Sequence, residues 1–277
     1  MMSNKVISEW YIVNEISENI FWVREPGFVS FFIFRNDKKA LLIDSGLGLS
    51  LTAAKELFTQ LNIQEYDVIC THGHCDHIGL NGNAKNIGIS NNEWEKFEKQ
   101  NEKNQLLNFL TMLEKNGKKP SILNEREILG FNNWIPTHFL ASGQLINFAN
   151  WKFEVKSVPG HTCGSLMFHE LTTNFLFSGD VIYTGKMYMH LKDSDIDDFY
   201  KSIEKLCTLK EIYPRLKVWP SHNVIPLPDD YPKKVQRALG LHSDGELPVV
   251  GKWQKDLIFE EGLIYSYDGV EIVVRSK

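Results

Sequence analysis

The stretch that most restricts the fold of this chain is "THGHCDHIG", residues 71–79, which places three histidines and one aspartate within six consecutive positions. It follows "YDVIC", a short apolar run that predicts a buried strand. Imidazole and carboxylate are ligands that zinc prefers, and a catalytic zinc keeps one position open for water. Four such donors are too many for one open site. The stretch therefore predicts a loop after a strand that offers ligands to two metal ions.

Three later segments supply further donors of the same kind. They are "VPGHTCGS", "FSGDVIY" and "VWPSHN", and in each the donor follows a predicted strand, where a rigid scaffold can aim a side chain at a shared centre. Together with the loop, they provide enough ligands for two metals. The candidate metal ligands are His72, His74, Asp76, His77, His161, Asp180 and His222.

The rest of the chain alternates between predicted strands and helices, which indicates an α/β class. Residues 28–34 and 40–43 read as a hairpin around a polar turn. Ser50 is a candidate N-cap for a helix, and Asp195 precedes a second helix with apolar residues at helical spacing. Near the end, Asp268-Gly269 lies between β-branched and aromatic runs, which is typical of a two-residue hairpin turn.

We expect one domain over residues 1–277, with two additions to its central pattern. Residues 92–140 are charged and helical in character, and form either a helix pair packed on the domain or the wall of an aliphatic or acyl pocket. Residues 240–277 form a β-hairpin extension that either extends a sheet or pairs with another subunit, which favours a homodimer.

Net charge, apolar runs and cysteine spacing indicate which binding partners and which cellular compartment to expect. The formal net charge of −5 offers no basic field for phosphates, so we expect a small-molecule substrate and no nucleic acid. No apolar run is long enough to cross a bilayer, and the first residues lack the features of a signal peptide, so we expect no membrane partner. The four cysteines show no CxxC spacing, which suits a reducing compartment and predicts a cytoplasmic protein.

The HxHxDH loop with the later His, Asp and His resembles the metallo-β-lactamase superfamily of hydrolases, over roughly residues 20–225. The resemblance implies a four-layer αββα sandwich with the metals at one edge of the two sheets. It also implies a ligand assignment, in which Asp180 bridges the two metals. The first metal would be held by His72, His74 and His161, and the second by Asp76, His77 and His222.

Two zinc ions, with iron or manganese as alternatives, would lower the pKa of a shared water and polarise a carbonyl group. We therefore expect a metal-bound hydroxide to attack the carbonyl of a small thioester or lactone-like ester, without a covalent enzyme intermediate. Asp76 is either a ligand alone or also a catalytic residue that passes a proton to the leaving group. Asp44, at the end of a predicted strand, either hydrogen-bonds a ligand histidine or the loop backbone, or caps a turn.

Details of the pattern favour one branch of the superfamily. The bridging Asp180 resembles the glyoxalase II, lactonase and thioesterase branches and disfavours a β-lactamase. Tyr183 matches a tyrosine that hydrogen-bonds the substrate carbonyl in the lactonase branch, which makes it a candidate catalytic residue, with simple packing as the alternative. The segments "EWY", "NIFWVRE" and "GDVIY" look like acyl-CoA thioesterases, so a thioester is the first choice.

Four other functions remain open. A persulfide dioxygenase-like oxidoreductase with one iron would leave Asp76, His77 and His222 without metal. A β-lactamase and a nuclease of the same superfamily are disfavoured by Asp180 and by the acidic charge, respectively. A non-catalytic protein would keep its metals for stability alone.

Overall fold

The computed structural model describes residues 10–25, 29–97, 104–108, 110–111, 134–255 and 260–275, together with the backbone of residues 5–6. The chain divides into two compact units. The N-terminal unit comprises Met1–Ile89 and Trp94–Leu140, and the C-terminal unit comprises Ser90–Glu93 and Ala141–Lys277.

The N-terminal unit is built on an eight-stranded sheet whose strands follow one another in chain order. The strands are β1 (Lys5–Val6), β2 (Ile12–Ser17), β3 (Ile20–Arg24), β4 (Ser30–Asn36), β5 (Lys39–Ile43), β6 (Glu65–Ile69), β7 (Ile87–Ser90) and β8 (His138–Leu140). Strands β1 to β5 pair antiparallel, whereas β5, β6 and β7 run parallel. The predicted hairpin is β4–β5, and its first strand begins at Ser30, while Phe28 lies outside the described residues.

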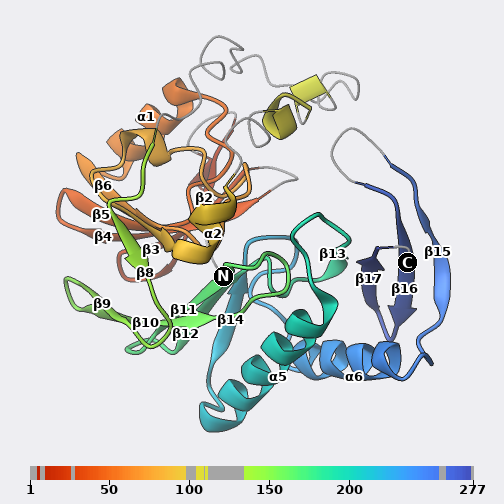
Figure 1. The fold of residues 1–277 in the computed structure, drawn as a ribbon. Coiled ribbons are helices and arrows are strands. Elements are labelled where there is room, and N and C mark those ends of the chain that lie inside the picture. The colour runs from red at the N-terminus through yellow and green to blue at the C-terminus, as the bar shows by residue number, and fades with distance from the viewer. Residues whose placement is uncertain are drawn as a thin grey trace. The chain divides into compact units, whose positions relative to one another are not determined.

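Helix α1 (Leu51–Gln60) packs on this sheet (Figure 1). It begins as predicted, because the Ser50 hydroxyl accepts a hydrogen bond from the backbone N–H of Ala53 at 3.2 Å. Its buried face, which includes Ala54 and Leu57, joins one apolar core with Val23 and Ile33 of the sheet. The helix fills the connection between β5 and β6, which allows these two strands to run parallel.

Of the predicted insertion over 92–140, the structure describes α2 (Asn91–Lys96), helical residues at 104–108 and 110–111, and β8. Leu106 and Leu110 are buried in the core of the N-terminal unit. The rings of Trp94 and Phe97 stack with centroids 5.3 Å apart, and Trp134 packs against both. Residues 98–103, 109 and 112–133 lie outside the described residues.

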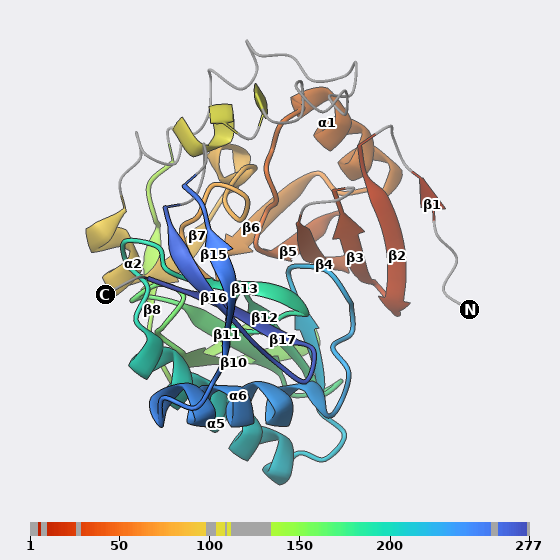
Figure 2. The same ribbon diagram turned by 90° about the vertical axis from the view of Figure 1, so that its right-hand side faces the viewer.

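The C-terminal unit contains two sheets and two long helices. One sheet has the order β14 (Lys217–Pro220), β12 (Phe175–Gly179), β11 (Leu166–Glu170), β10 (Trp151–Ser157) and β9 (Leu145–Phe148). The other has the order β13 (Gly185–Met189), β17 (Val270–Val274), β16 (Gly262–Tyr267) and β15 (Val249–Trp253). Helices α5 (Ile196–Ile212) and α6 (Tyr231–Ser243) lie side by side in both ribbon views (Figures 1 and 2). One apolar core joins them to strands of both sheets.

Two local predictions for this unit are confirmed. The helix predicted after Asp195 is α5, and the Asp195 side chain caps it by accepting hydrogen bonds from the backbone N–H groups of Asp197 and Asp198. Asp268 and Gly269, with φ angles of 48° and 79°, form the turn between β16 and β17. Strand β17 also pairs parallel with β13, so the hairpin extends a sheet of its own chain.

Both units combine strands with helices packed on them, so the α/β class predicted from the sequence is confirmed. No helix in the described part of the chain has the length and apolar character needed to cross a bilayer.

Candidate metal centre

The histidine loop of the N-terminal unit is set by the parallel pair β5–β6. Parallel neighbours end at the same edge of a sheet, so Asp44 after β5 lies beside Thr71 after β6. The two Asp44 carboxylate oxygens accept hydrogen bonds from the Thr71 backbone N–H and hydroxyl, both at 2.7 Å. The Nδ1 atom of His77 lies 2.8 Å from the same carboxylate. Of the two roles predicted for Asp44, contact with a candidate ligand histidine and with the loop backbone is therefore confirmed.

These contacts decide which nitrogen of each buried ring carries the proton. A carboxylate only accepts, so His77 donates through Nδ1, and in the neutral ring its Nε2 keeps a lone pair. The Thr71 hydroxyl donates to Asp44 and therefore accepts from His72 Nδ1, which lies 3.0 Å away. In that tautomer His72 Nε2 carries a lone pair that can bind a cation. Both rings are held in the tautomer that a metal ligand needs.

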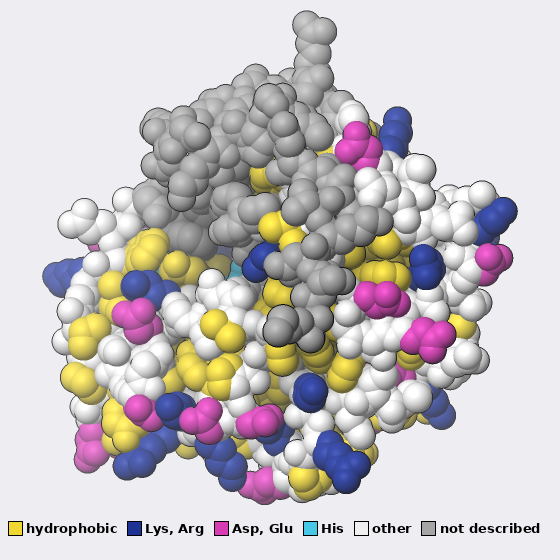
Figure 3. Space-filling view, turned by 180° about the vertical axis from the view of Figure 1, so that it is seen from behind, with side chains coloured by type: hydrophobic (Ala, Val, Ile, Leu, Met, Phe, Trp, Pro, Cys, Tyr) yellow, Lys and Arg dark blue, Asp and Glu magenta, His cyan; other side chains and the backbone are white. Residues whose placement is uncertain are grey.

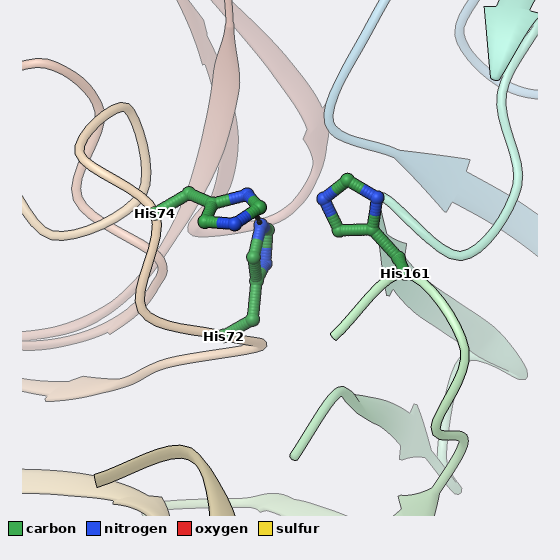
Figure 4. A group of neighbouring side chains, drawn as sticks. All are labelled: His72, His74 and His161. Atoms are coloured by element: carbon green, nitrogen blue, oxygen red, sulfur yellow. Dashed lines mark hydrogen bonds between the residues drawn. The ribbon is translucent and has the colours of Figure 1, made fainter. Parts of the chain in front are cut away.

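The His72 and His74 rings turn toward each other on this loop (Figure 4). His72 Nε2 and His74 Nδ1 are 3.1 Å apart. Two nitrogens bound to one tetrahedral zinc at about 2.05 Å would be separated by about 3.3 Å. The pair is therefore spaced like two ligands of a single ion. Figure 4 also draws His161, which belongs to the C-terminal unit.

Asp76 and His77 form a second pair on the same loop. Asp76 Oδ2 lies 3.7 Å from His77 Nε2, the nitrogen that keeps its lone pair in the neutral ring. His77 is fully buried, whereas the Asp76 side chain keeps 16% of its surface exposed. In this pair only the carboxylate is partly exposed, so solvent can approach from the Asp76 side.

In the C-terminal unit as well, the directions of the strands place the candidate donors at one edge of a sheet. Strands β10 and β12 are both antiparallel to β11, and β14 is parallel to β12, so all three strands end at the same edge. Asp180 directly follows β12, His222 follows β14, and His161 follows β10 by a short loop. The prediction that these donors stand after strands is confirmed.

The Asp180 carboxylate presents one oxygen to each of two histidines. Its Oδ1 lies 3.2 Å from His222 Nε2, and its Oδ2 lies 3.7 Å from His161 Nε2. His161 Nδ1 is 3.3 Å from the Tyr188 carbonyl oxygen, which only accepts, so Nδ1 carries the proton and Nε2 keeps its lone pair. This arrangement suits a carboxylate that bridges two cations, each also bound by one imidazole.

The loop that carries His161 is fixed by the first turn of α2. Glu93 accepts a hydrogen bond of 2.6 Å from the Thr162 hydroxyl, which also contacts the Ser165 hydroxyl at 2.8 Å. A Cβ on Gly164 would come within 2.4 Å of the Glu93 backbone nitrogen, so only glycine permits this approach. Sequence reasoning missed Glu93, because it lies 69 positions from its partner Thr162.

Tyr183 lies beside a candidate ligand. Its ring centroid is 5.3 Å from that of His222, in an edge-on arrangement, and only 3% of the residue is exposed. The side chain also belongs to the apolar core of the C-terminal unit. Its position is compatible with both predicted roles, packing and hydrogen bonding to a substrate.

The seven predicted ligands thus form two sets, one of four in the N-terminal unit and one of three in the C-terminal unit. The Nε2 lone pairs of neutral His72, His77 and His161, together with the carboxylates of the two sets, fit divalent zinc, iron or manganese. Sequence reasoning missed Thr71, which holds the His72 ring; a hydroxyl residue directly before the first histidine was the available signal.

Comparison with known proteins agrees with this chemistry. The family model of the metallo-beta-lactamase superfamily matches residues 24–240, and the chain therefore belongs to this superfamily. A solved metallo-beta-lactamase family protein from Thermus thermophilus superposes with a TM-score of 0.60 at 17% identity, covering 86% of this chain and 85% of the other. At this identity the likeness shows the fold alone, and it confirms the metallo-β-lactamase fold implied by the sequence resemblance.

Two curated relatives carry functional names. The human acyl-coenzyme A thioesterase MBLAC2 is 26% identical over 77% of this chain and 81% of its own length. A hydroxyacylglutathione hydrolase from Nitrosomonas eutropha is 26% identical over 65% of this chain and 56% of its own length. The superfamily and these relatives indicate that the chain is a hydrolase.

Proposed function

We propose that the two ligand sets meet around two metal ions, zinc in the first instance, and that the protein hydrolyses a thioester. His72, His74 and His161 hold the first ion, and Asp76, His77 and His222 hold the second. Asp180 binds both. Once bound, such a pair of ions supplies an acidified water and polarises the carbonyl group of the substrate.

The observation that carries this proposal is the geometry of Asp180. Its two oxygens face the Nε2 atoms of two different histidines, at 3.2 Å and 3.7 Å. A carboxylate that only oriented one histidine would need a single close contact to that ring. The two-sided approach supports a dinuclear centre over a mononuclear one, because a bridging ligand is useful only where there are two ions.

The choice of a thioester comes from the relatives. An acyl-coenzyme A thioesterase and a hydroxyacylglutathione hydrolase both act on an acyl group joined to the sulfur of a thiol carrier. The similarity to the thioesterase extends over the larger part of the chain, so an acyl-CoA is the first substrate to test. A lactone is the second, because the position of Tyr183 beside His222 suits donation to an ester carbonyl.

Two side chains of this protein have further roles in the proposal. Asp76, whose carboxylate is partly exposed, holds a proton taken from the attacking water and passes it to the leaving group. Tyr183 donates a hydrogen bond from its hydroxyl to the carbonyl oxygen as negative charge develops there.

The described part of the face in Figure 3 gives no support to a nuclease. Figure 3 shows lysine and arginine side chains interspersed with acidic side chains on the described part of the face that it presents. The net charge of −5 adds to this, since phosphate backbones are bound by continuous basic surfaces.

The decisive experiment is a substrate panel with the zinc-loaded protein. We expect turnover of acyl-CoA or glutathione thioesters, weaker activity on lactones and none on β-lactams. The Asp180→Ala variant should bind fewer than two equivalents of metal and lose most of its activity. If the protein instead binds one iron per chain and consumes oxygen, the hydrolase assignment would give way to a persulfide dioxygenase. Two bound metals without turnover of any substrate would indicate a structural role for the centre.

A further inference from the structure

Glu25 is a wholly buried acid in the N-terminal unit, directly after β3 and outside the predicted ligand set. Its Oε1 accepts a hydrogen bond of 2.9 Å from the Trp10 indole N–H, and its Oε2 accepts one of 2.8 Å from the backbone N–H of Leu47. Burying a charged group without compensation costs several kcal/mol, on the order of 5 or more. The two accepted hydrogen bonds compensate for part of this cost and hold the Glu25 side chain in one position.

The charge of Glu25 changes with pH near neutrality. Burial raises the pKa of its carboxyl to about 7, while the hydrogen bonds from Leu47, Trp10 and Gly48 act to lower it and the charge of Asp76 acts to raise it. Above that pH the carboxylate is ionised and accepts at both oxygens. An amide of the same size cannot do this, because one of its two polar atoms donates.

The Glu25 carboxylate packs closely against the short loop that follows Asp44. Gly46 has a φ of +66°, and a Cβ there would stand 3.0 Å from Glu25 Oε2. Gly48 has a φ of +60°, and a Cβ there would come within 2.2 Å of the Gly79 carbonyl oxygen. The backbone of residues 46–48 therefore packs closely against Glu25 at Gly46 and against the end of the histidine loop at Gly48.

The same short loop is bonded to the histidine loop along its length. The Ser45 backbone N–H donates to the His77 carbonyl at 2.8 Å, and the Gly79 N–H donates to the Gly46 carbonyl at 2.8 Å. Asp44, at the start of the loop, contacts His77 Nδ1 at 2.8 Å. A shift of residues 46–48 would therefore move both the backbone and the ring partner of His77.

We propose that Glu25 is a positioning residue that clamps residues 44–48 and thereby fixes the His77 ring for metal binding. The inference rests on the proposed function in one respect, that His77 is a ligand of the second metal. Glu25 touches neither metal nor substrate in this account, and it acts through Leu47, Gly46 and Asp44.

The test is a titration with Co²⁺ at pH 8, followed by the visible absorption of the bound ion, on the full chain. In Glu25→Gln the amide group turns a donor toward either Leu47 N–H or Trp10 N–H. We expect this variant to bind the second Co²⁺ about 10- to 100-fold more weakly than the wild type, the range found when a partner of a metal ligand is lost, with its absorption spectrum altered. Binding of the first Co²⁺ should change much less.

Two further variants separate positioning from general destabilisation. Leu57→Ala, in the buried face of α1, should lower the free energy of unfolding by about 2–5 kcal/mol and leave the affinity for the second Co²⁺ unchanged. Gly46→Ala leaves Glu25 in place but pushes the loop away from it, and should weaken the second site as Glu25→Gln does. This variant decides the matter if Glu25→Gln fails to fold.

The proposal would be overturned by wild-type affinity for the second Co²⁺ in a folded Glu25→Gln or in Gly46→Ala. It would equally be overturned if Leu57→Ala lost as much affinity as Glu25→Gln. A wild-type protein that binds fewer than two Co²⁺ ions would remove the dinuclear centre itself and with it this role of Glu25, a result distinct from two bound ions with unaffected variants.

Discussion

Replacing Asp44 with asparagine tests how the N-terminal unit prepares its ligands. The carboxylate accepts three hydrogen bonds, two from Thr71 at 2.7 Å and one from His77 at 2.8 Å. Asparagine offers one carbonyl oxygen and one amide group. If the oxygen keeps the bond to the Thr71 backbone, the amide faces His77 Nδ1 and donates to it. His77 must then carry its proton on Nε2, the nitrogen that would bind the metal.

The size of the effect follows from these contacts. A hydrogen bond to a charged group contributes about 1.5–3 kcal/mol, and each 1.4 kcal/mol is about tenfold in an equilibrium constant. Losing the bond and reversing the tautomer should therefore raise the dissociation constant of the second metal by about 10- to 100-fold. This agrees with the range seen when the partner of a metal-bound histidine is removed.

The assay is competition with a chelator of known affinity, monitored by metal content per chain. The matched control is Asp67→Asn, on β6, whose half-buried carboxylate accepts a hydrogen bond from Asn86. Asp44→Asn should lose affinity for the second metal and Asp67→Asn should not. Equal affinities in Asp44→Asn and the wild type would refute the argument that this carboxylate sets the His77 tautomer.

Three further changes test other parts of the account. Tyr183→Phe should lower kcat by about 5- to 30-fold, the effect of one hydrogen bond of about 1–2 kcal/mol, in steady-state assays; an unaltered rate would leave Tyr183 a packing residue. Gly48→Ala should abolish folding or metal binding, because its Cβ would clash with the backbone of Gly79. Gly143 has a φ of +82° and open space around it, so Gly143→Ala should lower the free energy of unfolding, measured by urea denaturation, by only about 1–2 kcal/mol. Burial raises the pKa of the Glu170 carboxyl, but hydrogen bonds from the β11–β12 turn and from Lys152 lower it by more, so the pKa lies below its ordinary value. The ionised carboxylate therefore stabilises the fold at every pH above the ordinary pKa, and this stabilisation is lost as the pH falls through the lowered pKa. Glu170→Gln should therefore be less stable than the wild type at pH 7 by about 1–3 kcal/mol, and the two should converge in acid denaturation; a difference independent of pH would contradict this.

Features that depend on neighbouring residues were predictable from the sequence. The Ser50 and Asp195 caps and the Asp268-Gly269 turn follow from short-range hydrogen bonding and backbone preference, and the structure contains all three. The candidate donors were predictable as well, because each follows a run of residues typical of a buried strand. The role of Asp44 came from its position at the end of such a strand.

Features that depend on distant residues were not predictable from one sequence. Glu25 bonds to Leu47 across 22 positions, and Glu93 to Thr162 across 69, and neither pair has a local signal. The parallel pairing of β13 with β17 joins residues 85 positions apart, such as Gly185 and Val270, and only the packed unit specifies this pairing. Such contacts arise when whole strands and helices pack, so the positioning of the ligands was less accessible than the ligands themselves.

The measurement that tests the central claim most directly is anomalous diffraction at the zinc absorption edge from crystals of the zinc-loaded protein. The account predicts two peaks about 3.5–4 Å apart, with Asp180 between them and histidines of both units bound to each ion. A single peak bound by one set alone, or two peaks with Asp180 in contact with neither, would contradict it.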